Sequence, residues 1–141
     1  MFSQPVGTVM KPGKLLLGAP GDSVAKVAKA MARRKVGAIA IVEGERLVGI
    51  FTERDALFRV LARGLDPRTT LVDAVMTRDP LTIGPTDPFG RALVIMNKKG
   101  CRHLPVVDGG RVVGMVSSRA ALDPKMEEFR SETERRRHFA G

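Results

Sequence analysis

The stretch GIFTERD occupies residues 49–55, and a similar stretch, GMVSSRA, occupies residues 114–120. An offset of 65 positions relates the two, and the same offset aligns the chain with itself without a gap from residue 20 to residue 57. Similarity of this extent indicates an internal duplication. The recurring residues include Pro20 with Pro85, Asp22 with Asp87, Met31 with Met96, Gly44 with Gly109, Gly49 with Gly114, and Leu57 with Leu122.

Each copy carries the pattern of a helix, two strands and a second helix. In the first copy, apolar residues at helical spacing predict a helix after an N-cap at Asp22 or Ser23. Two apolar runs on either side of a polar turn at Gly44 predict two strands. The stretch at 53–64 predicts a second helix that ends at Gly64. The expected buried helix faces are Val24, Val27, Ala28 and Met31 in the first copy, and Phe89, Ala92, Leu93 and Met96 in the second.

One copy of about 60 residues would bury too little apolar surface to be stable alone. Two copies packed strand face to strand face would cover each other. We therefore predict an α+β (α/β-like) fold built as a pseudo-two-fold pair, in which each repeat is a small sheet flanked by two helices. The predicted boundaries are a first repeat at 5–64, a connector at 65–74, a second repeat at 75–122 and a charged tail at 123–141.

The composition narrows the classes of protein. Hydrophobic residues make up 43% of the 141 residues, which is enough for a folded core. The single cysteine, Cys101, excludes an intrachain disulfide and disfavours a cysteine-based zinc site. The chain shows neither a signal peptide nor an apolar run of about 18 residues, so we expect a cytoplasmic protein that does not enter a membrane.

The formal net charge of +9 raises the question of nucleic-acid binding. The basic residues are spread along the chain rather than gathered, and Trp and Tyr are absent, so stacking platforms for bases are not expected. The sequence also lacks a phosphate-binding P-loop, a metal-ligand cluster and any recognisable catalytic set. We therefore expect neither a nucleic-acid-binding protein nor an enzyme.

The complete series of motifs resembles a tandem CBS-domain pair (cystathionine-β-synthase domain), also called a Bateman module. The first copy carries the resemblance in GDSVAKVAKAMARRKVGAIAIVEGERLVGIFTERDAL, residues 21–57. The second copy carries it in VMTRDPLTIGPTDPFGRALVIM and RHLPVVDGGRVVGMVSSRAAL, residues 75–96 and 102–122. The resemblance covers roughly residues 5–122, and the tail from Asp123 has no counterpart in it.

The resemblance implies a regulatory sensor that binds an adenine-containing ligand, such as AMP, ADP, ATP, NAD or S-adenosylmethionine, in the cleft between the repeats. By the same resemblance, the Asp of the Thr-x-x-Asp motif accepts hydrogen bonds from the ribose hydroxyls, and the Thr hydroxyl contacts the ribose or a phosphate. The extended segment that leads into the opposite repeat holds the adenine. Basic residues before the LPV strand contact the phosphates. The implied ligand-binding residues are Thr52, Arg54, Asp55, Leu81, Thr82, Arg102 and His103.

The residue types fit this chemistry independently, because a carboxylate accepts hydrogen bonds from both ribose hydroxyls and an arginine presents a fork of donors. A structural alternative exists: Thr52 and Asp55 also have the spacing of a helix N-cap and its first-turn acid. His103 and Arg102 likewise fit either phosphate contact or an ordinary structural and solvated role.

The duplication makes the two expected sites unequal. The first motif is Thr52-Glu53-Arg54-Asp55, whereas the second, Ser117 to Ala120, has lost the carboxylate. Ala120 indicates that the helix does not require the acid, which leaves Asp55 free to serve a ligand. The second motif is expected to face Leu16, Leu17, Gly37 and Ala38, which offer no polar side chain, so one site per chain is predicted.

The leading hypothesis is thus a stand-alone, non-catalytic sensor of an adenine nucleotide. The alternative is a ligand-free module for protein–protein interaction or oligomerisation. The resemblance also implies a homodimer, of parallel or antiparallel arrangement, which would cover apolar helix positions that one strand layer cannot. These positions are Leu57, Val60, Leu61, Met31 and Met96.

Overall fold

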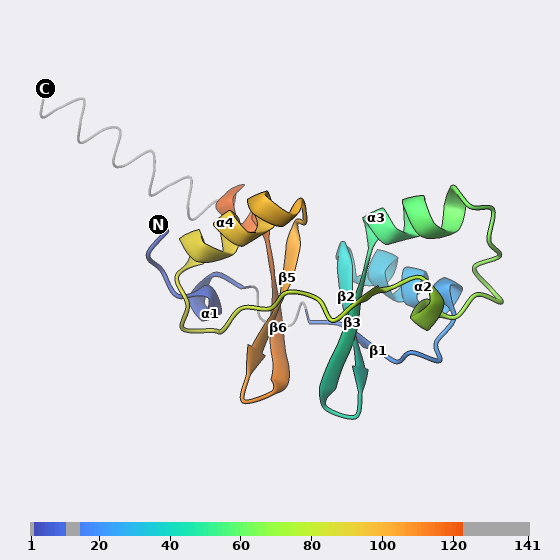
Figure 1. Ribbon diagram of the computed structural model, residues 1–141, viewed down its shortest axis with the longest axis horizontal. Helices are drawn as coiled ribbons and strands as arrows, with labels where there is room; N and C mark the ends of the chain where they lie inside the picture. Colours follow the sequence, from blue (N-terminus) through green and yellow to red (C-terminus); the bar gives the residue numbers. More distant parts are fainter. Residues whose placement is uncertain (1, 11–14, 123–141) are drawn as a thin grey trace, which may run out of the picture.

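The computed structural model describes residues 2–10 and 15–122 (Figure 1). The helices are α1 (Val6–Val9), α2 (Val24–Arg34), α3 (Glu53–Asp55) and α4 (Phe89–Lys99). A π-helical segment, Ala56–Leu61, continues α3, and 3-10 turns span Val72–Ala74 and Ser118–Leu122. The strands are β1 (Leu17–Gly18), β2 (Ala38–Glu43), β3 (Arg46–Thr52), β4 (Thr77–Arg78), β5 (His103–Asp108) and β6 (Arg111–Ser117).

The two predicted hairpins are present and have matching geometry. Strands β2 and β3 pair antiparallel, as do β5 and β6. Each hairpin has a register shift, between Ile41 and Val42 in the first and between Val106 and Val107 in the second. These positions are related by the 65-residue offset, so the duplication extends to the irregularities of the backbone.

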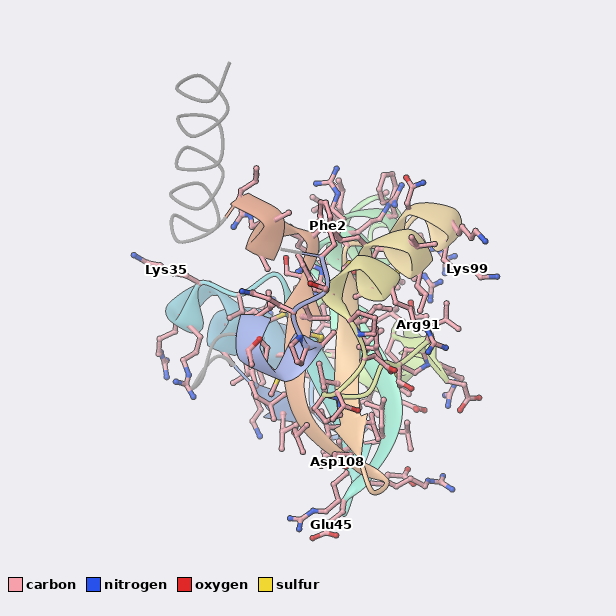
Figure 2. The ribbon with its side chains drawn as sticks, turned by 90° about the vertical axis from the view of Figure 1, so that its left-hand side faces the viewer. Phe2, Lys35, Glu45, Arg91, Lys99 and Asp108 are labelled. Atoms are coloured by element: carbon pink, nitrogen blue, oxygen red, sulfur yellow. The ribbon has the colours of Figure 1, made fainter. Side chains whose placement is uncertain are left out.

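The hairpins lie next to each other in the middle of the molecule, with α4 on one outer side and α2 and α3 on the other (Figure 1). An ion pair of 3.3 Å between Arg111 Nη2 and Glu45 Oε1 joins the turns of the two hairpins. Figure 2 shows Glu45 and Asp108 together at this end of the molecule. The mixed helix and strand architecture of two similar halves agrees with the α+β prediction.

Helices α2 and α4 differ at their N-termini and in the residue type that ends them. The Ser23 hydroxyl caps α2 by accepting a hydrogen bond from the Lys26 amide, whereas Pro88 precedes α4 without a side-chain cap. Both helices end on a residue in the left-handed conformation, which is Lys35 after α2 and Gly100 after α4. Glycine adopts this conformation without steric cost, and lysine does not.

Each half has its own apolar core, and each core includes residues from the segment that leads into the other repeat. Val72, Val75 and Met76 pack in the core of the first half, whereas Val6 packs in the core of the second half. The Val6 amide donates to the Asp87 carbonyl at 2.8 Å, and the Val72 amide donates to the Asp22 carbonyl at 2.8 Å. The segment that leads into each repeat therefore packs on the other repeat.

The second helices of the two repeats differ. In the first repeat, the helix formed by α3 and the π-helical segment ends at Leu61, and the predicted stop residue, Gly64, follows in the turn with a φ of 68°. In the second repeat, the described part of the equivalent segment, Ser118–Leu122, is a 3-10 turn, and the predicted tail at 123–141 lies outside the described residues. The expectation that both copies begin the same helix is therefore wrong for residues 118–122.

Several of the apolar positions expected to need a partner are covered within one chain. Met31, Val60 and Met96 are buried in the two cores. Leu57 and Leu61 remain exposed, at 50% and 72% of their surface. The apolar face that one chain leaves open is therefore narrower than the sequence suggested.

Candidate ligand cleft between the repeats

A cavity of about 910 Å³ lies where the two repeats meet. Its wall comes from the end of β3 and the helix that follows, from residues 77–81, and from the end of α4 and the start of β5. Six of the seven sequence-predicted residues line it: Thr52, Arg54, Asp55, Leu81, Arg102 and His103. Thr82 is exposed and is not part of the wall.

Asp55 has a position that sequence alone did not reveal. It is 8% exposed and is the buried charged residue of the described chain. Its Oδ2 accepts a hydrogen bond from the Thr52 amide at 3.1 Å, and the Thr52 hydroxyl accepts one from the Asp55 amide at 3.1 Å. The two residues thus form a capping box at the start of α3.

The other oxygen of Asp55 is held more loosely. Oδ1 lies 3.4 Å from the Thr77 hydroxyl and 3.6 Å from Nε of Arg59. Both distances exceed those of strong charge-assisted hydrogen bonds, which are about 2.7–2.9 Å. Oδ1 therefore keeps acceptor capacity at the wall of the cavity.

Arg54 connects the two repeats at the cavity. Its Nη1 donates to the carbonyl of Gly100 at 2.9 Å, and Gly100 is the residue that ends α4. The guanidinium carbon also lies 5.6 Å from the centre of the Phe58 ring. A cation at a helix C-terminus interacts favourably with the helix dipole, so Arg54 has a structural role in addition to its place in the wall.

His103 is half-buried between the repeats. A Cβ atom added to Gly37 would lie 3.2 Å from both the His103 ring and the Glu53 carboxylate, so both side chains lie close to Gly37. Burial lowers the pKa of His103, and the nearby positive charges of Arg119 and Arg102 lower it further, while Glu53 acts in the opposite direction. Burial is the largest of these effects, and it favours the neutral imidazole.

In the second repeat, alanine stands at the position that Asp55 occupies in the first repeat. Ala120 packs against the core of its own half, together with Ala121. Ser117 does not cap in the manner of Thr52, because its hydroxyl accepts from the Arg119 amide, two residues later. The second repeat therefore lacks the carboxylate and also has a 3-10 turn after β6 where the first repeat has an α-helix after β3.

Sequence reasoning missed several residues of the cavity wall. The charged and polar ones are Glu53, Arg59, Thr77, Asp79 and Lys99. Arg59 follows Asp55 by four residues, a helical spacing that could have indicated the pair. Thr77 and Asp79 offered no such signal, because only the fold brings the start of the second repeat beside α3.

A family model described as CBS domain matches residues 6–62 and 72–124. The chain belongs to the CBS-domain family. The two matched ranges confirm a tandem pair of CBS domains, as the sequence resemblance implied.

Two plant CBS-domain proteins are similar to the chain. The CBS domain-containing protein CBSCBSPB1 of Arabidopsis thaliana is 38% identical over 118 residues, which are 82% of this chain and 22% of that protein. The mitochondrial protein CBSX3 of the same plant is 33% identical over 119 residues, which are 81% of this chain and 58% of that protein. The chain therefore spans less than two thirds of either relative.

Solved CBS-domain structures share the fold. A putative signal-transduction protein with CBS domains from Burkholderia ambifaria gives a TM-score of 0.79 at 28% identity, covering 88% of this chain and 95% of its own. The CBS domain protein PAE2072 from Pyrobaculum aerophilum, complexed with AMP, gives 0.79 at 25% identity, with coverage of 87% and 95%. The CBS domain pair of protein MJ0100, in complex with 5'-methylthioadenosine and S-adenosyl-L-methionine, gives 0.77 at 26% identity, with coverage of 84% and 97%.

Two observations bear on other classes of function. Within residues 2–10 and 15–122, no group of three or more His, Cys, Asp and Glu side chains is arranged to hold a metal ion. None of the helices in this part of the chain has the length and apolar character needed to cross a bilayer.

Proposed function

We propose that the chain is a non-catalytic regulatory module of the cytoplasm that binds an adenine nucleotide (AMP, ADP, ATP or NAD) between its CBS domains. One observation carries this proposal: the buried carboxylate of Asp55 lies at the wall of the 910 Å³ cavity with one oxygen only loosely engaged. A ribose offers two adjacent hydroxyl donors, which suit such an oxygen.

The charges around the cavity support a phosphorylated ligand. The side chains of Lys99 and Arg102 are exposed in the part of the wall that the second repeat provides, whereas Asp55 belongs to the part that the first repeat provides. Lys99 projects from the end of α4 in Figure 2. Cations on one side and a diol acceptor on the other match the two polar parts of a nucleotide.

Structural relatives support the adenosine part of the proposal. PAE2072 is complexed with AMP, and the CBS pair of MJ0100 with 5'-methylthioadenosine and S-adenosyl-L-methionine. Adenosine is the portion that these three ligands share. We propose that the present chain also binds the adenosine portion of its ligand, and the titrations below test how many phosphates that ligand carries.

Calorimetric titration with AMP, ADP, ATP and NAD tests the proposal, with S-adenosylmethionine as a comparison. We expect binding with a stoichiometry near one per chain, because the second motif lacks the carboxylate. Asp55→Ala should weaken binding at least tenfold, since each hydrogen bond to a charged acceptor contributes roughly 1.5–3 kcal/mol. Glu43→Ala, an exposed acid in the first hairpin, is the matched control. Failure of all five ligands to bind at millimolar concentration would exclude the sensor function.

The second candidate is a ligand-free interaction module. It is favoured by the capping box, which gives Asp55 a structural role, and by the exposed apolar residues of the helix after β3. These are Leu57, Phe58 and Leu61. We propose that a second copy of the chain covers them in a homodimer under either function, so only the titration separates the two candidates.

A further inference from the structure

Arg59 lies between Asp55 and the segment that enters the second repeat. Its Nε is 3.6 Å from Oδ1 of Asp55. Its Nη1 donates to the Met76 carbonyl at 2.9 Å and lies 3.4 Å from the Val75 carbonyl. One guanidinium therefore contacts both the buried acid and two consecutive carbonyls of the main chain.

The segment that Arg59 contacts continues into the cavity wall. Val75 and Met76 are buried in the first core, and Thr77–Arg78 then pairs with β3 as strand β4. Beyond the strand, Asp79 takes the left-handed conformation with a φ of 43°, and Pro80 and Leu81 line the cavity. Arg59 thus anchors the main chain just before it forms one wall of the cavity.

Thr77 closes this arrangement. Its hydroxyl lies 3.4 Å from Oδ1 and 3.5 Å from Oδ2 of Asp55. The carboxylate is consequently held from three directions: by the Thr52 amide, by Thr77 and by Arg59. Two of these three groups also fix the segment 75–77, so the orientation of the acid and the position of the wall depend on one another.

We propose that Arg59 is a positioning residue that sets ligand affinity by holding Asp55 and the 75–81 segment in one arrangement, an inference that rests on the proposed nucleotide-binding function. The planar guanidinium suits this task, because it has five donors in a fixed fork and serves the acid and the carbonyls together. A lysine ammonium is a compact charge on a flexible side chain, and it contacts either the acid or a carbonyl, but not both at once.

The proposal differs from direct phosphate binding by Arg59 in a measurable way. A positioning residue acts through Asp55 and the wall, and it affects adenosine, AMP and ATP by the same factor. A direct phosphate contact affects ATP strongly and adenosine hardly at all. The three ligands therefore form an internal comparison.

The experiment compares Arg59→Gln and Arg59→Lys with two controls, all titrated calorimetrically with adenosine, AMP and ATP. Arg63→Gln changes an exposed arginine at the end of the same helix, and Val60→Ala removes core volume beside Arg59 without touching the cavity wall. We expect Arg59→Gln to weaken the binding of every ligand that the wild type binds by about tenfold, because the hydrogen bond from the Arg59 guanidinium to the Met76 carbonyl is lost. The ligand affinity of Arg59→Lys should lie between those of Arg59→Gln and the wild type, and both control variants should have wild-type affinity.

Three results would overturn the proposal: unchanged affinity in Arg59→Gln, a loss confined to phosphorylated ligands, or full affinity in Arg59→Lys. An equal loss in Val60→Ala would also overturn it, because affinity would then follow general stability. If Arg59→Gln does not fold, Arg59→Lys decides the comparison by the same criteria.

Amide hydrogen exchange of residues 76–79 in the ligand-free protein separates this inference from the proposed function. Faster exchange there in Arg59→Gln, and not in Arg63→Gln, shows that Arg59 anchors the wall even if the wild type binds no nucleotide. In that case the nucleotide function fails and the anchoring survives. Unchanged exchange overturns the anchoring whatever the titrations show.

Discussion

Met76 lies directly over Gly49, so that a Cβ atom added to Gly49 would be 2.5 Å from the Met76 sulfur. Met10 covers Gly114 of the second repeat in the same way. Each methionine belongs to a segment that leads into one repeat and packs on the other. The two glycines thus mark the places where these crossing segments close the cores.

Gly49→Ala should destabilise the protein, because its new methyl group requires the buried Met76 to move. Inserting a methyl group into a packed core costs about 1–3 kcal/mol, which urea denaturation measures. Gly21→Ala is the control, since nothing lies within 4 Å of an added Cβ there. Combining Gly49→Ala with Met76→Ala should cost less than the two separate changes by about 0.5 kcal/mol or more. Strict additivity would show that the contact with Met76 is not the cause.

Lys35→Gly should stabilise the protein. Lys35 has a φ of 55°, whereas the equivalent residue of the second repeat, Gly100, adopts its φ of 67° freely. Relief of the left-handed strain outweighs the added chain entropy of glycine by about 0.5–1 kcal/mol. The melting temperature should rise for Lys35→Gly and fall for Gly100→Lys, and the opposite pair of shifts would contradict the strain assignment.

Asp55→Ala should also lower stability, by about 0.5–1.5 kcal/mol, because the hydrogen bond from the Thr52 amide to its carboxylate is lost while Thr52 still caps the helix. The spacing of Thr52 and Asp55 left a capping role open beside the ligand role, and the carboxylate of Asp55 does accept a hydrogen bond from the Thr52 amide. Asp55→Asn should lose less stability, since its amide oxygen still accepts that bond. Thermal melts of both variants check this order, and equal stability of all three proteins would remove the capping box as a contributor.

The unfolding free energy should depend on pH through His103. Its pKa in the folded protein lies below the ordinary value of 6.5, so the unfolded chain binds the proton more readily. The stability is therefore greatest above pH 6.5 and decreases as the pH falls through 6.5 towards the folded pKa. His103→Gln should flatten this part of the profile. A profile that His103→Gln leaves unaltered would assign the effect elsewhere.

The chain should form a homodimer near 31 kDa, about twice its 15.3 kDa. Light scattering at tens of micromolar checks this mass. Leu61→Glu should shift it towards the monomer, because Leu61 is 72% exposed on the apolar helix face. Arg46→Glu, at an exposed position in the first hairpin, should leave the dimer intact. A wild type that is monomeric at this concentration would reject the dimer.

Local pattern predicted the elements well, because helices and strands leave periodic traces in the sequence. The hairpins were confirmed for this reason, and of the two predicted N-caps, Asp22 and Ser23, the structure has Ser23. The crossing of Val6 and Val72 into opposite cores leaves no periodic trace, and the sequence did not predict it. Thr77 was not predicted either, because it comes close to Asp55 only when the segment that contains Val72 packs on the first repeat.

The crossing of the leading segments has a consequence for synthesis on the ribosome. The first core needs nothing beyond Met76, so it can close while the second repeat is still being translated. The second core needs Val6, which is made early, and Val116, which is made more than a hundred residues later. Residues 6–9 therefore have no packing partners from the second core during most of translation. Since contacts between distant residues slow folding, the second core should be the slower to form and the more dependent on chaperones.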